Sequence, residues 1–82
     1  MRSPWQTQVA SDIIRDGLGY ELLDDAENIV AEVFRCDADL TVTVSVFDES
    51  LLQEVVEELV AEARQCLGAF EDGTPLPDVF DV

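Results

Sequence analysis

The sequence predicts a two-layer α+β domain in which a helix, a three-stranded antiparallel sheet and a second helix follow one another (αβββα). Three observations support this fold class. The chain of 82 residues can bury one small core, residues 40–46 alternate apolar and polar side chains, and residues 48–68 carry an apolar stripe at helical spacing. We expect residues 1–68 to form a single domain and residues 69–82 to form an extended acidic tail.

The first helix is predicted over residues 4–16. Ser3, Pro4 and Gln6 form a capping-box pattern with proline at the first helical position. Gly17 is a natural C-terminal stop. Its apolar face would consist of Trp5, Val9, Ala10, Ile13 and Ile14.

Three strands are expected next, over residues 20–23, 29–35 and 40–46. A polar turn separates the first two strands, and a four-residue connection of hairpin length separates the last two. A helix over residues 25–35 is the alternative, because Ile29 and Val33 are spaced by about one helical turn. The side chains of the third strand that we expect to face the core are Leu40, Val42, Val44 and Val46.

The second helix has the most regular pattern in the chain. Asp48 or Ser50 can cap it, and with Asp48 as the cap Phe47 would pack on Leu52. Gly68 is expected to end it. Its apolar stripe comprises Leu52, Val55, Val56, Leu59, Val60, Ala63 and Leu67. The apolar residues that could attach the tail to the domain, or to a partner, are Phe70, Leu76, Val79 and Phe80.

The charge is strongly one-sided: 19 acidic side chains face 4 basic ones, the net charge is -15, and histidine and lysine are absent. A compact domain with this charge repels itself, so a basic partner, bound cations or high salt should offset the repulsion. Direct binding to nucleic acid or to an anionic membrane is disfavoured for the same reason. Without histidine the common catalytic triads are absent, and we expect no enzyme activity, no cofactor and no metal site.

Acidic side chains are therefore the candidate binding residues. On the second helix, Glu54, Glu58 and Glu62 are four residues apart and rise by about 6 Å per step. Such a ladder imitates the regular negative charge of duplex DNA. The complete candidate set is Glu54, Glu57, Glu58 and Glu62 on the helix, with Asp24, Asp25, Glu27, Asp37 and Asp39 in the loops.

This pattern predicts a small non-enzymatic binding protein that occupies the basic, nucleic-acid-binding surface of a partner protein. Its element order and charge resemble those of some small phage-encoded acidic inhibitors, including certain anti-CRISPR proteins. The resemblance is one of layout and charge. It implies an inhibitor that mimics DNA, of the anti-CRISPR or anti-restriction type.

A second interpretation is an accessory protein that acts through an apolar surface or as a homodimer, with its acidity reflecting salt adaptation. Pairing would then use the predicted edge strand over residues 20–23 or the tail. An EF-hand is rejected because Val42 stands where that loop needs glycine. Cys36 and Cys66 are expected to be reduced thiols in a cytoplasmic protein, and no apolar run has the length of a membrane span.

Overall fold

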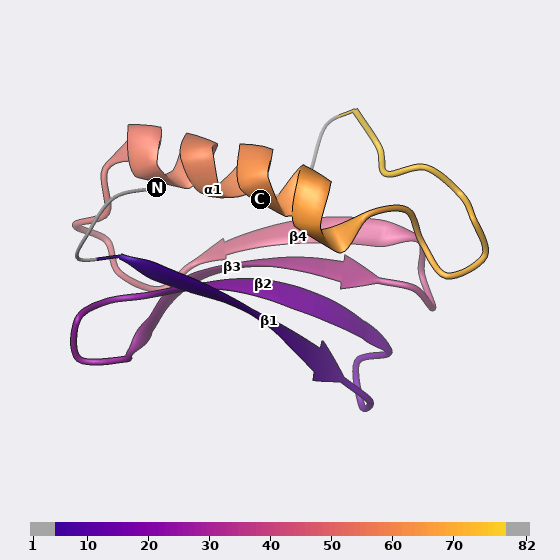
Figure 1. Cartoon of the computed structure of the whole chain (residues 1–82), viewed down its shortest axis with the longest axis horizontal. Coiled ribbons are helices and arrows are strands. Elements are labelled where there is room, and N and C mark those ends of the chain that lie inside the picture. The colour runs from indigo at the N-terminus through magenta and orange to yellow at the C-terminus, as the bar shows by residue number, and fades with distance from the viewer. Residues whose placement is uncertain (1–4, 79–82) are drawn as a thin grey trace.

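The computed structural model describes residues 5–78 and shows a four-stranded antiparallel sheet with one helix across one of its faces (Figure 1). The strands follow one another in the sheet in chain order. The fold is thus a two-layer α+β meander, and the predicted αβββα order is wrong. The elements are β1 (Gln6–Asp12), β2 (Gly17–Leu23), β3 (Ile29–Cys36), β4 (Thr41–Val46) and α1 (Gln53–Leu67).

The first helix predicted over residues 4–16 does not form. Residues 6–12 instead pair with residues 17–23, in continuous register, as the first hairpin of the sheet. Ile13 and Ile14 were expected in the core but lie in the tight turn, where they are 94% and 97% exposed. Pairing with a partner strand has overridden a local helix pattern. The element order of the small phage inhibitors is lost with this helix, so only the charge still supports that resemblance.

The middle of the sheet is longer than predicted. β2 begins at Gly17 rather than Tyr20, and it lies between β1 and β3. The edge strand that was to mediate homodimer formation is therefore a central strand with both sides paired. Residues 29–36 form β3, so the alternative helix over residues 25–35 is also wrong.

The strand predicted over residues 40–46 is confirmed as β4, and its alternation holds in the middle of the strand. Val42 and Val44 are 1% and 4% exposed beneath the helix layer, whereas Val46 is 42% exposed. Leu40 is equally exposed because it occupies the preceding turn with a φ of 56°. Only the two central valines of this strand are buried in the core.

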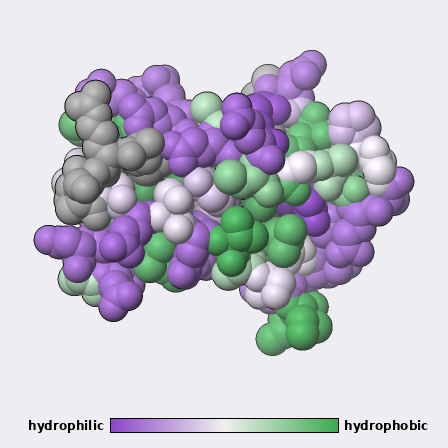
Figure 2. All heavy atoms as spheres, in the orientation of Figure 1, coloured by the Kyte–Doolittle hydropathy of each residue, from purple (hydrophilic) through white to green (hydrophobic). Residues whose placement is uncertain are grey.

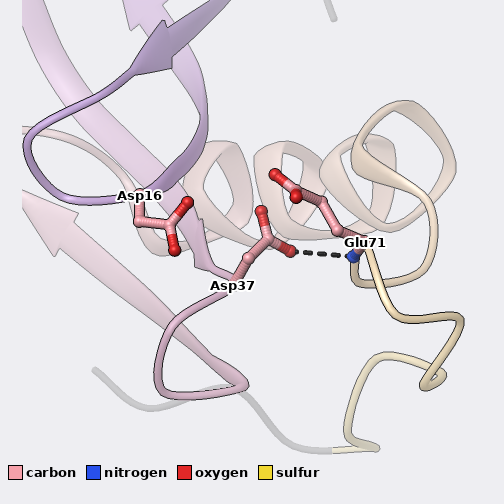
Figure 3. A group of neighbouring side chains, drawn as sticks. All are labelled: Asp16, Asp37 and Glu71. Carbon is pink, nitrogen blue, oxygen red and sulfur yellow. Dashed lines mark hydrogen bonds between the residues drawn. The ribbon is translucent and has the colours of Figure 1, made fainter.

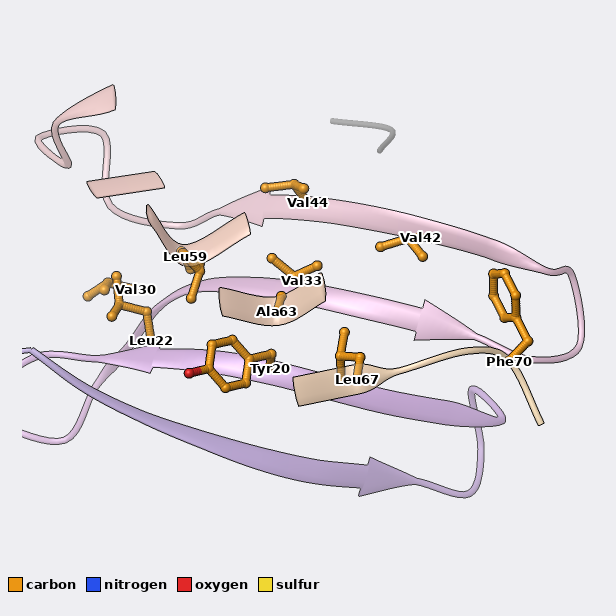
Figure 4. Close-up of a cluster of buried hydrophobic side chains, with 11 residues drawn as sticks. Tyr20, Leu22, Val30, Val33, Val42, Val44, Leu59, Ala63, Leu67 and Phe70 are labelled. Carbon is orange, nitrogen blue, oxygen red and sulfur yellow. The ribbon is translucent and has the colours of Figure 1, made fainter. Parts of the chain in front are cut away.

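From Val55 to Leu67 the apolar stripe of α1 packs on the sheet as predicted. Leu52, predicted as its first member, precedes the helix and is 61% exposed. Leu59, Ala63 and Leu67 are buried against β2 and β3, and Figure 4 shows them between the helix and the sheet. The start of the helix is corrected. α1 begins after Leu52, which makes no side-chain cap, while Asp48 instead accepts hydrogen bonds from the backbone and hydroxyl of Ser50 at 3.0 and 2.7 Å.

Gly68 ends α1 with a φ of 65°, as the sequence indicated. The following segment folds back onto the domain as far as it is described. Phe70 is 3% exposed and belongs to the core. Leu76 is partly buried and packs against the same core. Arg35 donates hydrogen bonds to the carbonyl oxygens of Leu67 and Ala69. Of the predicted tail anchors, Val79 and Phe80 lie outside the described residues.

Candidate functional site

Three glutamates form an exposed acidic surface along the outer side of α1. We call Glu54, Glu57 and Glu58 the acidic helix face. Glu54 and Glu58 form no hydrogen bond or ion pair within residues 5–78, and Glu57 accepts one bond from Gln53 at 3.3 Å. Hydrophilic atoms gather over the layer occupied by α1 (Figure 2). The core side of the helix fixes the direction of these carboxylates, because its stripe is packed against the sheet.

Glu62 is placed differently from the other helix candidates. It is only half-buried, and its carboxylate accepts a hydrogen bond of 2.9 Å from the Tyr20 hydroxyl on β2. Burial raises the pKa of Tyr20 to about 12, so the hydroxyl keeps the proton that it donates. The third step of the expected ladder is thus directed at the sheet, and the outward carboxylates are those of the acidic helix face.

The arginines within residues 5–78 are engaged in structural contacts. Arg15 binds Asp12 at 2.6 Å and Glu32 at 2.9 and 3.0 Å. Arg35 pairs with Asp37 at 3.1 Å. Arg64 donates to the carbonyl oxygens of residues 77 and 78 at 2.8 and 2.5 Å. These cations fasten loops and the C-terminal segment to the domain.

The first group of loop candidates lies in the turn between β2 and β3. Asp24 has a structural role there, because its carboxylate accepts hydrogen bonds from the backbone of Ala26 and Asn28 at 2.9 Å each. The bond from Asn28 lowers the pKa of Asp24 below its usual value. Asp25 and Glu27 are exposed beside it. Because Asp37 and Asp39 follow the far end of β3, the loop candidates form two separate groups.

The second group contributes to a cluster that sequence spacing does not reveal. Asp16, Asp37 and Glu71 come from the β1–β2 turn, the β3–β4 turn and the segment after α1, and one carboxylate oxygen of each lies within 4.8 Å of the others. Figure 3 shows the three side chains together, with Asp37 accepting the backbone N–H of Glu71 at 3.0 Å. Carboxylate oxygens suit calcium or magnesium. Asp37 already has Arg35 as its counter-charge, so the cluster does not define a metal site.

A different polar cluster covers the sheet face opposite α1. Glu32 and Phe34 point away from the core because they alternate with Val33 along β3. The Arg15 guanidinium donates hydrogen bonds to both carboxylate oxygens of Glu32, and its Cζ lies 3.9 Å from the centroid of the Phe34 ring. A Cβ atom at Gly19 would come within 2.6 Å of the Glu32 carboxylate, so glycine makes room for this cluster. A hollow of about 390 Å³ adjoins it and is lined by Arg15, Glu32, Phe34, Cys36, Asp39, Thr41, Thr43 and Ser45.

The chemistry available in this hollow is limited. Arg15 and Glu32 neutralise one another. The single proton of the Cys36 thiol has two acceptors within reach, the Arg15 carbonyl oxygen at 3.4 Å and the Asp39 carboxylate at 3.7 Å. A thiol needs a basic partner to act as a nucleophile, and neither acceptor is one. Both cysteines, Cys36 and Cys66, are free thiols.

Comparisons with known proteins add no assignment. Protein-family models, curated proteins and solved structures all returned no match to this chain. Within residues 5–78, α1 is too short and too polar to cross a membrane, and no other helix is present.

Proposed function

We propose that this protein is a small non-enzymatic binding protein that occupies a basic surface of a partner, by charge complementarity of the DNA-mimic type. The acidic helix face carries the proposal. It combines exposed carboxylates, a rigid apolar support and counter-ions that are engaged elsewhere. A nucleic-acid-binding protein fits best as the partner, because its groove of lysine and arginine presents the complementary charge.

The first test uses a defined pool of basic partners, namely proteins of the source cell that are retained on duplex DNA. Association of the immobilised protein with this pool should fall steeply with salt, and free duplex DNA should compete for it. Electrostatic attraction accelerates association more than it slows dissociation, so the on-rate is the sensitive quantity. Binding that is insensitive to salt and to DNA would contradict the proposal.

A pair of charge-matched variants then locates the surface. The triple variant Glu54→Lys, Glu57→Lys, Glu58→Lys changes the net charge from -15 to -9, since each reversal adds two charges. The control variant Asp16→Lys, Glu71→Lys, Asp78→Lys reaches the same net charge through exposed residues away from the acidic helix face. We expect the first variant to lose most of its association rate and the control to keep more of it. Equal losses would show that only the total charge matters.

One observation favours a second candidate function, an accessory protein that binds through an apolar contact. The turn between β1 and β2 presents Ile13 and Ile14 almost fully to solvent, and a hydrophobic projection stands out at that end of the molecule (Figure 2). Binding through this turn should be insensitive to salt and lost in the variant Ile13→Ser, Ile14→Ser. Retention of binding by that variant excludes this function.

A cytoplasmic location belongs to the same proposal and is consistent with the two free thiols. Alkylation of Cys66, which is exposed, in freshly opened cells measures its redox state. A thiol found oxidised throughout the cellular pool would argue for an oxidising compartment.

A further inference from the structure

Within residues 5–78, no strand pairs with the outer edge of β4, and this edge lacks the usual protection. β4 pairs with β3 in unbroken register, and its backbone makes no other hydrogen bond within residues 5–78. Natural edge strands are commonly protected by a charged residue, a proline or a bulge. β4 has none of these, although more than a quarter of the chain is charged. All eight residues from Leu40 to Phe47 are uncharged.

Carboxylates stand at both ends of this uncharged edge. Asp39 precedes it and is exposed, and Asp48 and Glu49 follow it. Antiparallel pairing of two β4 strands would set Thr41 of one copy opposite Val46 of the other. Asp39 of each copy would then lie beside Asp48 of its neighbour, at both ends of the pair. Like charges placed across a strand pair are destabilising, so this fully overlapping pairing of two copies is disfavoured.

The sheet face beside this edge has room for incoming side chains. The hollow of about 390 Å³ opposite α1 is lined along β4 by Thr41, Thr43 and Ser45, and Asp39 lies at its border. Hydroxyl groups can bond to polar side chains of a neighbouring strand. A basic side chain at the end of such a strand would meet Asp39.

We propose that the β4 edge receives an extended segment of the partner protein, which adds a fifth strand to the sheet. The segment is uncharged over about six residues, to match Thr41–Val46, and carries lysine or arginine at both ends. Main-chain hydrogen bonds to β4 hold it, and Asp39, Asp48 and Glu49 select its terminal charges. That the ends of the segment are basic rests on the proposed function, in which the partner is a basic protein. The β4 edge itself is a different surface from the acidic helix face.

The test is a titration of isotope-labelled protein with a synthetic peptide, Arg-Thr-Val-Thr-Val-Thr-Arg, followed by NMR. The amide signals of residues 41–46 should shift, and hydrogen exchange should slow at the alternate residues whose N–H groups point away from β3, because these groups become paired. A peptide of the same pattern with glutamate at both ends should not bind. Shifts confined to α1 or β1, equal binding of the glutamate peptide, or no shift at any peptide concentration would overturn the inference.

Backbone N-methylation separates strand pairing from simple charge attraction. Only alternate residues of a strand face a given neighbour, so two N-methylated peptides are needed, one for each set of alternate residues. We expect one of them to bind about tenfold more weakly or worse, since two or three hydrogen bonds are lost, and the other to bind like the parent peptide. Equal affinities of all three peptides would contradict main-chain pairing.

Two further measurements keep this inference separable from the proposed function. The variant Glu54→Lys, Glu57→Lys, Glu58→Lys should still bind the arginine-ended peptide at β4, because its changes lie on α1. If that peptide fails on the wild type while salt-dependent partner binding persists, only the strand-addition inference is lost. Slow amide exchange along the whole of β4 in the free protein, or a dimer in sedimentation, would show that the edge is already occupied.

Discussion

The two faces of the sheet are covered by different kinds of contact. On the helix side, Leu22, Val33 and Leu59 are completely buried, and the contact is apolar. On the opposite side there is no helix within residues 5–78, and Arg15 and Glu32 form an ion pair over Phe34. Residues 5–78 supply one helix, which covers one face. The other face is closed by a few long polar side chains.

The difference has a physical consequence for how each face tolerates change. Apolar burial is nondirectional and roughly proportional to area, so the helix side depends on volume. The ion pair depends on geometry, because Arg15 must reach both Glu32 oxygens while lying on the Phe34 ring. The missing side chain at Gly19 provides that room. We therefore expect volume changes to be costly on the helix side and charge changes to matter on the opposite side.

The largest effect is expected for Leu59→Ala on the helix side. Truncating a fully buried leucine removes apolar contacts and leaves a cavity, which should lower the free energy of unfolding by about 2–5 kcal/mol. Urea unfolding measures this loss. Val46→Ala is a matched control, because its side chain is 42% exposed, and should cost less than about 1 kcal/mol. Similar losses for both variants would mean that α1 does not hold the sheet as described.

A smaller effect is expected for Glu32→Gln on the opposite face. The substitution keeps the shape but removes the charge that holds Arg15, whose side chain is half exposed and can return to water. We expect a loss of about 1–3 kcal/mol in the free energy of unfolding. NMR should also show the Arg15 side-chain signals moving away from ring-current positions over Phe34. Asp25→Asn, at an exposed site, is the control; an equal loss there would contradict a closing role for the ion pair.

The smallest effect is expected on the acidic helix face, which belongs to neither side of the sheet. Glu58→Gln removes the like-charge pairs with Glu54 and with Glu62, so the free energy of unfolding should rise by about 0.2–0.5 kcal/mol per pair at low salt. The pair with Glu62 should contribute less, because that carboxylate is directed at Tyr20. Added salt should erase this gain. Glu54→Gln should gain less, because an acid in the first turn favours the helix dipole. Thermal unfolding across a salt series measures both variants.

The same salt series bears on why the chain is acidic. A wild-type protein that is unstable at physiological ionic strength and regains stability at high salt would support salt adaptation. A melting temperature that changes little with salt would leave partner binding as the better reason for the uncompensated charge.

Much of α1 and β4 was predictable because each has a strong local pattern. Apolar residues recur at helical spacing from Val55 to Leu67, and Gly68 provides a stop. β4 alternates valine with threonine and serine. The acidic helix face was predictable for the same reason, since residues opposite an apolar stripe must face outward.

The first hairpin and the polar clusters could not be predicted in this way. Residues 6–12 have a weak pattern, and they form a strand because β2 offers an open edge to pair with. Arg15 and Glu32 are 17 residues apart. The partners in the cluster of Asp16, Asp37 and Glu71 come from three separate segments. Their proximity depends on the meander order of the strands.

The sequence alone thus determined the charge, the helix with its outward acids, and the alternating strand, because each depends on neighbours within a few residues. Tertiary structure alone decided that residues 6–12 extend the sheet, that Glu62 turns to Tyr20, and that β4 is the last strand of the sheet formed by residues 5–78. These features depend on which distant segments meet. The hydrogen bonds of a strand pair form only when two distant segments meet. The spacing of apolar residues within one segment therefore does not reveal the pairing.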